Sequence, residues 1–218
     1  MVKTATGASG HTIIQVDKQG QNCILYFGGA NKMIDAQYID QVMALCQAGD
    51  YILLQNEINM VPEIMTRAKA QGLKIVFNPS PISQDILDYP LEAVDLLIVN
   101  ETEGKAISGH SEPAQILETL VSQYPQTDIL LTLGKDGAIF KNKDQEYRHG
   151  IYDVKVVDTT AAGDTFTGFF LKFYAEKQDI ERCLRYASVA SSIAVGRAGA
   201  APSIPTLTEV EGSELINL

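Results

Sequence analysis

Short runs of apolar residues alternate with longer amphipathic stretches along most of the chain. The runs are rich in Val, Ile, Leu and Phe and adjoin Gly, Pro, Asn or Asp, which is typical of β-strands. Strands are predicted over residues 12–17, 22–27, 51–54, 74–77, 96–99, 129–132, 138–141, 146–149 and 151–157. Helices are predicted over residues 35–47, 61–71, 101–107, 113–123, 164–177 and 180–195, with a short one after residue 205. This alternation predicts an α/β fold in which helices cover both faces of a mainly parallel sheet.

Two strand pairs are predicted to be antiparallel. Residues 12–17 and 22–27 form a hairpin through a turn at residues 17–21, and residues 138–141 pair with residues 146–149. Polar residues recur at or just past strand ends: Glu57, Asn78, Asn100, Glu103, Thr132, Gly134 and Asp164. Ligands in such sheets bind at the carboxyl ends of the strands, so this distribution predicts one cleft.

Composition narrows the class of protein. The chain has 218 residues, 45% of them hydrophobic, which is enough for the core of a single domain over residues 1–218. Its net charge of −10 opposes binding to nucleic acid or an anionic membrane surface. The three cysteines are scattered and no apolar run has membrane length, so a reducing, cytoplasmic location is expected.

The stretch with the clearest chemistry is residues 158–168, Asp-Thr-Thr-Ala-Ala-Gly-Asp-Thr-Phe-Thr-Gly. Small residues between a predicted strand and a predicted helix let backbone amides approach a ligand, and the helix dipole favours a phosphate there. Asp164 has two interpretations. It is either an N-cap of the helix or a base that deprotonates a hydroxyl attacking the phosphate.

This stretch closely resembles the signature of the ribokinase (PfkB) family of carbohydrate kinases. The resemblance implies a three-layer ribokinase-like fold and transfer of the ATP γ-phosphate to a sugar hydroxymethyl group, with ribose favoured. Asp164 would be the catalytic base and also a substrate contact. The amides of Ala161, Ala162 and Gly163 would form the anion hole.

Other family motifs imply the metal and nucleotide contacts. The sequence from Asn100 to Glu103 resembles an N-x-x-E motif that places Mg²⁺ through Glu103, although a helix start with acidic first-turn residues is the structural alternative. ATP would contact Asn100, Thr132, Gly134, Gly137 and Ser188. Lys135 and Asp136 are interpreted as solvated turn residues.

The segment from Val195 to Ser203 is similar to a family segment that encloses a monovalent cation. Carried over by position, K⁺ would be held by Asp158, Thr160, Ala194, Arg197, Gly199 and Ser203. Main-chain carbonyls with one carboxylate suit such a hard ion. Gly196 departs from the usual Thr, and Ser188 stands where relatives often carry Asn or His.

Glu57 is similar to a sugar-binding Glu of the family, and a carboxylate can accept two hydroxyl hydrogen bonds. The resemblance aligns with the carboxyl-terminal two-thirds of the family. On this alignment the family's N-terminal strands and most of its lid are missing, and residues 11–31 are the remnant of the hairpin returning from the lid. The uncovered surface raises the prospect of a homodimer. The alternatives are a truncated, non-catalytic nucleotide-binding fragment and a kinase for fructose or a nucleoside.

Overall fold

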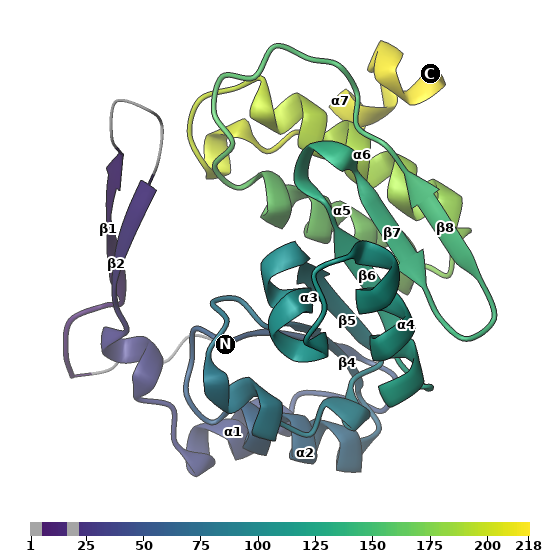
Figure 1. Cartoon of the computed structure of the whole chain (residues 1–218). Coiled ribbons are helices and arrows are strands. Elements are labelled where there is room, and N and C mark those ends of the chain that lie inside the picture. The colour runs from purple at the N-terminus through teal and green to yellow at the C-terminus, as the bar shows by residue number, and fades with distance from the viewer. Residues whose placement is uncertain (1–5, 17–21) are drawn as a thin grey trace. The chain divides into compact units, whose positions relative to one another are not determined.

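The computed structural model describes residues 6–16 and 22–218, which divide into two compact units, Met1–Leu96 and Leu97–Leu218. Six strands are hydrogen-bonded in chain order: β3 (Tyr51–Gln55), β4 (Lys74–Asn78), β5 (Leu96–Asn100), β6 (Asp128–Thr132), β7 (Ala138–Lys141) and β8 (Glu146–His149). β3 and β4 are parallel, whereas β6–β7 and β7–β8 are antiparallel, so the sheet is mixed (Figure 1). The predicted three-layer α/β class is confirmed, and the expectation of a single domain stays a prediction.

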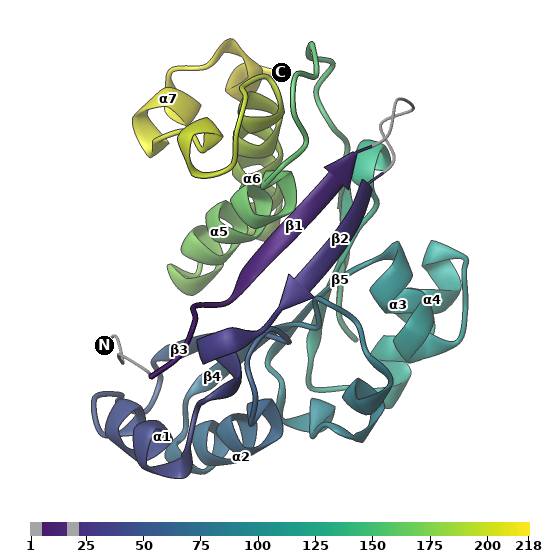
Figure 2. The same ribbon diagram turned by 90° about the vertical axis from the view of Figure 1, so that its left-hand side faces the viewer.

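In the first unit, β1 (His11–Val16) and β2 (Asn22–Phe27) form a separate antiparallel hairpin (Figure 2). The pairing confirms the predicted hairpin, and its predicted turn at residues 17–21 lies outside the described residues. The Tyr26 hydroxyl donates to the Glu57 carbonyl at 2.7 Å, and Asn59 exchanges two hydrogen bonds with the Ile34 backbone. The hairpin base is thereby tied to the loop after β3.

Two helices flank β3 and β4 in this unit. α1 (Ala36–Met43) is capped by Asp35, whose carboxylate accepts the Tyr38 amide at 2.7 Å, and α2 (Val61–Gln71) ends at Gly72 with φ 79°. α2 matches its predicted bounds, but α1 is shorter than the predicted 35–47. The Leu45 and Cys46 amides bond three residues back instead, and the exposed Leu45 side chain has no core to join.

The second unit has helices on both sides of its strands: α3 (Glu101–Ser108), α4 (Pro113–Gln123), α5 (Ala162–Ala175), α6 (Ile180–Val195) and α7 (Leu207–Glu211). Phe140 and its neighbour Leu130 occupy one sheet face, where Phe140 stacks on Phe170 of α5 with centroids 6.2 Å apart. Leu131 occupies the other face, beside Gly104 of α3. Short 3₁₀ turns span Gly29–Lys32, Gln84–Asp88, Leu91–Ala93, Gly134–Asp136, Ala201–Ser203 and Glu214–Asn217.

The predicted strand at residues 151–157 is wrong. This segment is irregular, and the amides of Val157 and Asp158 both donate to the Val195 carbonyl at the end of α6 rather than to a strand. Its alternating apolar side chains suggested a half-buried strand, yet Ile151, Val156 and Val157 are more than half exposed. Ile151 and Val156 line a pocket, which explains why apolar residues occur in a segment that does not pair with a strand.

Candidate active site

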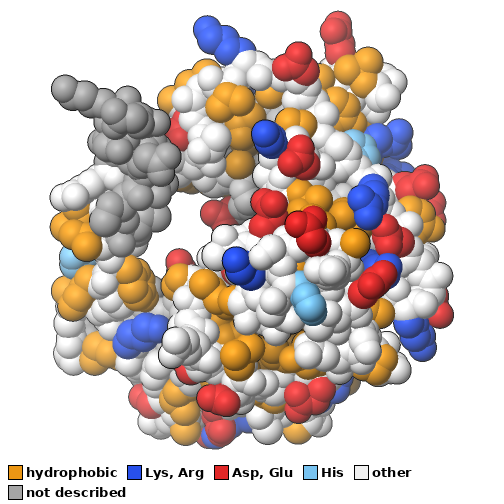
Figure 3. Space-filling model, viewed as in Figure 1, with side chains coloured by type: hydrophobic (Ala, Val, Ile, Leu, Met, Phe, Trp, Pro, Cys, Tyr) orange, Lys and Arg blue, Asp and Glu red, His pale blue; other side chains and the backbone are white. Residues whose placement is uncertain are grey.

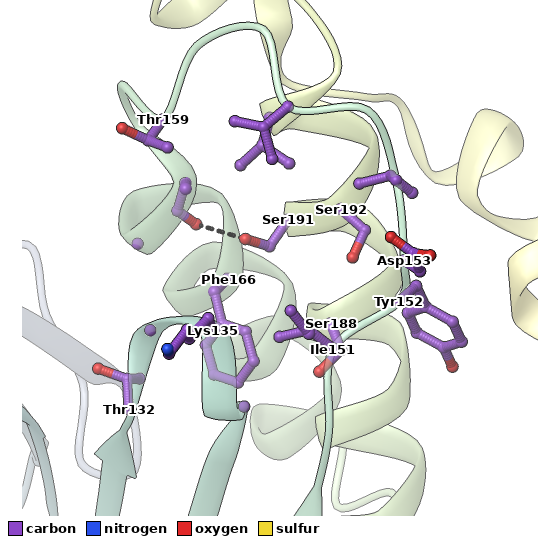
Figure 4. A pocket seen from close by; sticks show the side chains of 17 residues that line it. Thr132, Lys135, Ile151, Tyr152, Asp153, Thr159, Phe166, Ser188, Ser191 and Ser192 are labelled. Carbon is purple, nitrogen blue, oxygen red and sulfur yellow. Dashed lines mark hydrogen bonds between the residues drawn. The ribbon is translucent and has the colours of Figure 1, made fainter. Parts of the chain in front are cut away.

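The second unit contains a pocket of about 480 Å³ whose walls are mostly apolar. It is lined by the β6–β7 turn, the irregular segment before α5, the first turn of α5 and one face of α6 (Figure 4). Six of the predicted site residues meet there: Thr132, Gly134, Gly137, Ala162, Gly163 and Ser188. Residues predicted from the sequence thus contribute to three of its walls, namely the β6–β7 turn, α5 and α6.

The wall formed by α5 is an open helix start. Its N-cap residue, Ala161, has left-handed φ of 60° and no capping side chain. The Ala162 amide bonds the Thr159 carbonyl at 3.2 Å, but among the described residues the amides of Gly163 and Asp164 have no acceptor. Of the predicted anion hole, the Ala161 and Gly163 amides thus have no acceptor among the described residues, while the Ala162 amide is already engaged.

Asp164 is the third residue of α5, so its interpretation as the N-cap is wrong. The helix begins two residues earlier because Ala161 supplies the turn and accepts both the amide and the hydroxyl of Thr165, at 2.9 and 2.8 Å. The Asp164 side chain is exposed and has no hydrogen-bond partner within the described part of the chain. An unengaged carboxylate in a first helical turn is available for chemistry.

Three serines line the pocket from α6, at positions 188, 191 and 192. Their spacing of three and four residues places them on one helix face (Figure 4). Ser188 is only 4% exposed, and its hydroxyl is the one buried side-chain polar atom without a partner among the described residues. The Ser191 hydroxyl donates to the Ala162 carbonyl at 3.1 Å. Because an unsatisfied buried hydroxyl is costly, the Ser188 hydroxyl is a group that a ligand or a water molecule in the pocket would satisfy.

The opposite wall is the turn between β6 and β7. Gly134 and Gly137 have φ of 52° and 90°, and the Leu133 amide closes the turn on the Gly137 carbonyl at 2.8 Å. A Cβ at Gly137 would collide with the His149 carbonyl oxygen, so only glycine fits. Lys135, interpreted from sequence as a solvated turn residue, is exposed but also lines the pocket.

Asn100 and Glu103 form a capping box at the start of α3. The Asn100 side chain accepts the Glu103 amide, and the Glu103 carboxylate accepts the Asn100 amide, both at 2.9 Å. Glu103 is 3% exposed. The motif therefore forms the capped helix start, with acidic residues in its first turn, that was the structural alternative. A magnesium role for Glu103 would have to use carboxylate electron pairs that the capping box leaves available.

The residues predicted to hold K⁺ are partly brought together. Asp158 accepts the amides of Thr160 and Gly199 at 2.9 and 3.0 Å, which joins the segment before α5 to the segment after α6. A hydrogen bond from the Thr160 side chain, followed by these two amide bonds, lowers the pKa of Asp158.

The other members of that set lie at or beyond the end of α6. The Arg197 amide donates to the Ala194 carbonyl at 2.9 Å, while the Arg197 side chain pairs with Glu209 at 2.7 Å. Ser203 is fully buried and donates to the Ala200 carbonyl at 2.7 Å. Carbonyl oxygens and one carboxylate are a donor set that fits K⁺.

The remaining candidate, Glu57, belongs to the first unit. Its side chain is exposed in the loop after β3 and has no partner among the described residues. A separate pocket of about 550 Å³ lies in this unit, and Glu57 does not line it. Its neighbour Asn56 does, and Asn56 is fixed by bonds to the Pro81 carbonyl and the Ser83 hydroxyl at 2.9 and 2.8 Å. The loop carrying Glu57 is thus rigidly held at Asn56.

Two features are absent from the described residues. Within residues 6–16 and 22–218, no three His, Cys, Asp or Glu side chains gather so as to hold a metal ion. None of the helices in the same part of the chain combines the length and apolar character that crossing a bilayer requires. On the face shown in Figure 3, acidic and basic side chains are interspersed.

Several lining residues were missed from sequence: Tyr152, Asp153, Val154, Thr159, Phe166, Ser191, Ser192 and Val195. One signal was available for part of this set. Ser188, Ser191 and Ser192 interrupt a helix face that is otherwise small and apolar, at helical spacing. The irregular segment offered no such signal, because its alternating pattern is the one that predicts a strand.

Comparison with known proteins is consistent with this geometry. The pfkB family carbohydrate kinase profile matches residues 1–207. A ribokinase of Staphylococcus aureus (strain COL) is 34% identical over 218 residues, covering 96% of this chain and 71% of that relative.

Solved structures give the same result. Arabidopsis thaliana ribokinase complexed with ribose and ATP superposes with a TM-score of 0.79 at 28% identity, covering 97% of this chain and 70% of the other. Ribokinase from Giardia lamblia gives a TM-score of 0.82 at 29% identity, covering 95% and 72%.

Proposed function

Because this chain belongs to the pfkB family of carbohydrate kinases, we propose that it transfers the γ-phosphate of ATP to a sugar hydroxymethyl group, with ribose as the favoured acceptor. The observation that carries the proposal is the pocket of the second unit, where an open helix start adjoins an apolar cavity with an unpartnered Ser188 hydroxyl. An anion and a flat, hydrogen-bonding base are the two ends of a nucleotide.

Each residue has a defined part in the proposed reaction. The nucleotide base enters the apolar cavity beside Ser188, while the phosphates lie between the β6–β7 turn at Thr132 and the free amide of Gly163. Asp164 takes the proton of the sugar hydroxyl while the oxygen of that hydroxyl bonds to the γ-phosphorus. The bond between the γ-phosphorus and the β–γ bridging oxygen breaks, and ADP is released. Glu57, in the first unit, is proposed to accept hydrogen bonds from sugar hydroxyls.

Two cations belong to the proposal. Mg²⁺ would be held through Glu103 together with nucleotide phosphates and water, since magnesium needs only one or two carboxylates when phosphates are present. K⁺ would be held by the segments that Asp158 joins, with Asp158, Thr160, Ala194, Arg197, Gly199 and Ser203 as its neighbours. When bound, these ions neutralise the charge that accumulates on the phosphates. The cytoplasmic location and the homodimer stay predictions, as does alignment with the carboxyl-terminal part of the family.

The test is Asp164→Asn, with Asp144→Asn in the exposed β7–β8 turn as the matched control. Asp164→Asn is expected to lower turnover by about 10²- to 10⁴-fold, the usual contribution of a general base, with nucleotide affinity nearly unchanged. Turnover is measured with a coupled assay for ADP, and affinity by calorimetric titration with a non-hydrolysable MgATP analogue in K⁺ buffer, then with ribose.

The outcomes separate the candidate functions. Loss of nucleotide binding in Asp164→Asn would show that the residue is structural. A wild-type chain that binds nucleotide but transfers no phosphate to ribose, fructose or a nucleoside would be the non-catalytic nucleotide-binding protein.

A further inference from the structure

We propose that Ser191 is a positioning residue that fixes and polarises the peptide unit whose Gly163 amide is offered to the phosphate. The inference rests on the proposed function, because it concerns the same anion hole. Ser191 would contact neither nucleotide phosphate nor sugar in this role, and it would act through the backbone of α5.

The geometry joins Ser191 to a single peptide group. Its hydroxyl donates to the Ala162 carbonyl oxygen at 3.1 Å, which Figure 4 marks as a dashed line. That carbonyl and the Gly163 amide belong to the same planar peptide unit. The Gly163 amide has no acceptor among the described residues. Ser191 therefore bonds one end of the unit whose other end is open to a ligand.

The neighbouring peptide unit provides the contrast. The Ala161 carbonyl accepts the Thr165 hydroxyl at 2.8 Å, but the amide of that unit, on Ala162, is already bonded to Thr159. Thr165 thus bonds a peptide unit whose amide is already engaged, whereas Ser191 bonds a peptide unit whose amide is available to a ligand.

Ser191 is itself held on a rigid platform. Its neighbours on α6, including Val189, Ala190 and Ala194, are fully buried, so the helix cannot shift without disturbing the core. A donor fixed in this way limits rotation of the Ala162–Gly163 peptide plane and restricts the direction in which its amide points. Hydrogen bonds in a chain also polarise one another, by roughly 10–30% per bond, so a bonded carbonyl makes the amide a stronger donor.

The consequence should appear in the rate rather than in ground-state affinity. A pre-oriented amide is most effective where charge develops in the transition state. Ser191→Ala is expected to lower kcat by about threefold to tenfold while KM for ATP changes less than about twofold. Ser191→Thr keeps a hydroxyl on Cβ and should recover most of the lost kcat. The control is Thr66→Ala, which removes a hydroxyl bonded to a helix carbonyl at 2.9 Å in the first unit.

A measurement without turnover accompanies the kinetics. In a ¹H–¹⁵N spectrum of the full chain, the Gly163 amide proton should move upfield in Ser191→Ala and return in Ser191→Thr. Titration with inorganic phosphate should shift the Gly163 resonance less at equal phosphate concentration in Ser191→Ala than in the wild type.

The inference is overturned if Ser191→Ala matches the wild type in kcat and in the Gly163 resonance. It is also overturned if Ser191→Thr fails to recover either quantity and the melting temperature falls, because Ser191 would then be a packing residue only. If the wild type transfers no phosphate, the kinase proposal fails separately, and the Gly163 resonance with its phosphate titration still decides the role of Ser191.

Discussion

Two helices of the second unit begin in opposite ways. α3 closes its own start, since Asn100 and Glu103 exchange hydrogen bonds with each other's amides. α5 begins at Ala161, which has no side chain able to cap, and leaves the Gly163 and Asp164 amides without an acceptor among the described residues. A closed start contributes to stability, whereas an open one beside a cavity is available to an anion.

A third helix shows that the backbone shape alone does not distinguish these functions. α2 also follows a left-handed N-cap residue, Met60, with φ of 61° against 60° at Ala161. Its second residue is Pro62, which has no amide hydrogen, whereas the second residue of α5 is Gly163. The same turn therefore occurs with and without an amide hydrogen on its second helical residue, and that difference can be engineered.

The largest expected effect on nucleotide affinity comes from giving α5 the sequence feature of α2. Gly163→Pro removes the open amide, and Pro62 shows that a proline is accommodated at this helix position after a left-handed residue. Loss of a hydrogen bond to a charged phosphate should lower affinity for a MgATP analogue by about tenfold to a hundredfold, from roughly 1.5–3 kcal/mol. Calorimetric titration measures this.

Gly163→Ala is the matched control for that substitution. A Cβ at Gly163 would meet no atom within 4 Å, so this variant keeps both the amide and the fold. Equal affinity for Gly163→Pro and Gly163→Ala, with unchanged melting temperatures, would contradict the assignment of this amide to the phosphate.

The same contrast explains what sequence could predict. The bounds of α2, α4, α6, β2, β7 and β8 match the predictions, because apolar periodicity and flanking Gly or Pro define them locally. Ala161 was placed in the anion hole from its motif, but its left-handed backbone was not predicted, because alanine carries no side-chain signal for that conformation. The segment at residues 151–157 has a strand pattern and lacks a strand partner in the described chain, a fact that local sequence does not contain.

A moderate effect is expected at the closed start. Asn100→Ala removes the acceptor of the Glu103 amide and should lower the free energy of unfolding by about 1 kcal/mol, the usual value for a lost N-cap. Asn100→Ser, which retains a capping oxygen, should lower it by only a few tenths. Urea denaturation measures both, and equal stability of Asn100→Ala and the wild type would show that the capping box contributes nothing.

A smaller effect, of opposite sign, is expected at the open start. A non-glycine residue in the left-handed region costs about 1–2 kcal/mol, while glycine loses about 0.5–1 kcal/mol through greater chain entropy. Ala161→Gly should therefore raise the free energy of unfolding by about 0.5–1 kcal/mol, and Met60→Gly at α2 should behave alike. A decrease in Ala161→Gly alone would mean that the Ala161 methyl group makes a packing contribution larger than the strain.

The smallest effect is expected in the segment before α5. There Asp158 contacts Gly199, which is distant in sequence, whereas α3 is capped by residues of its own first turn. Asp158 accepts the amides of Thr160 and Gly199, and its pKa is lowered by hydrogen bonds from the Thr160 side chain and from these amides. A carboxyl with a lowered folded-state pKa contributes its stabilisation above the unfolded value of about 4 and loses it as the pH falls through the folded value. The Thr160 and Gly199 amide resonances should therefore titrate together, with a midpoint below pH 4, and Asp158→Asn should remove that transition. Independent midpoints for the two amides would mean that Asp158 does not join the segment before α5 to the segment after α6 in solution. The start of α5 would then have no stabilising side-chain contact comparable to the capping box of α3.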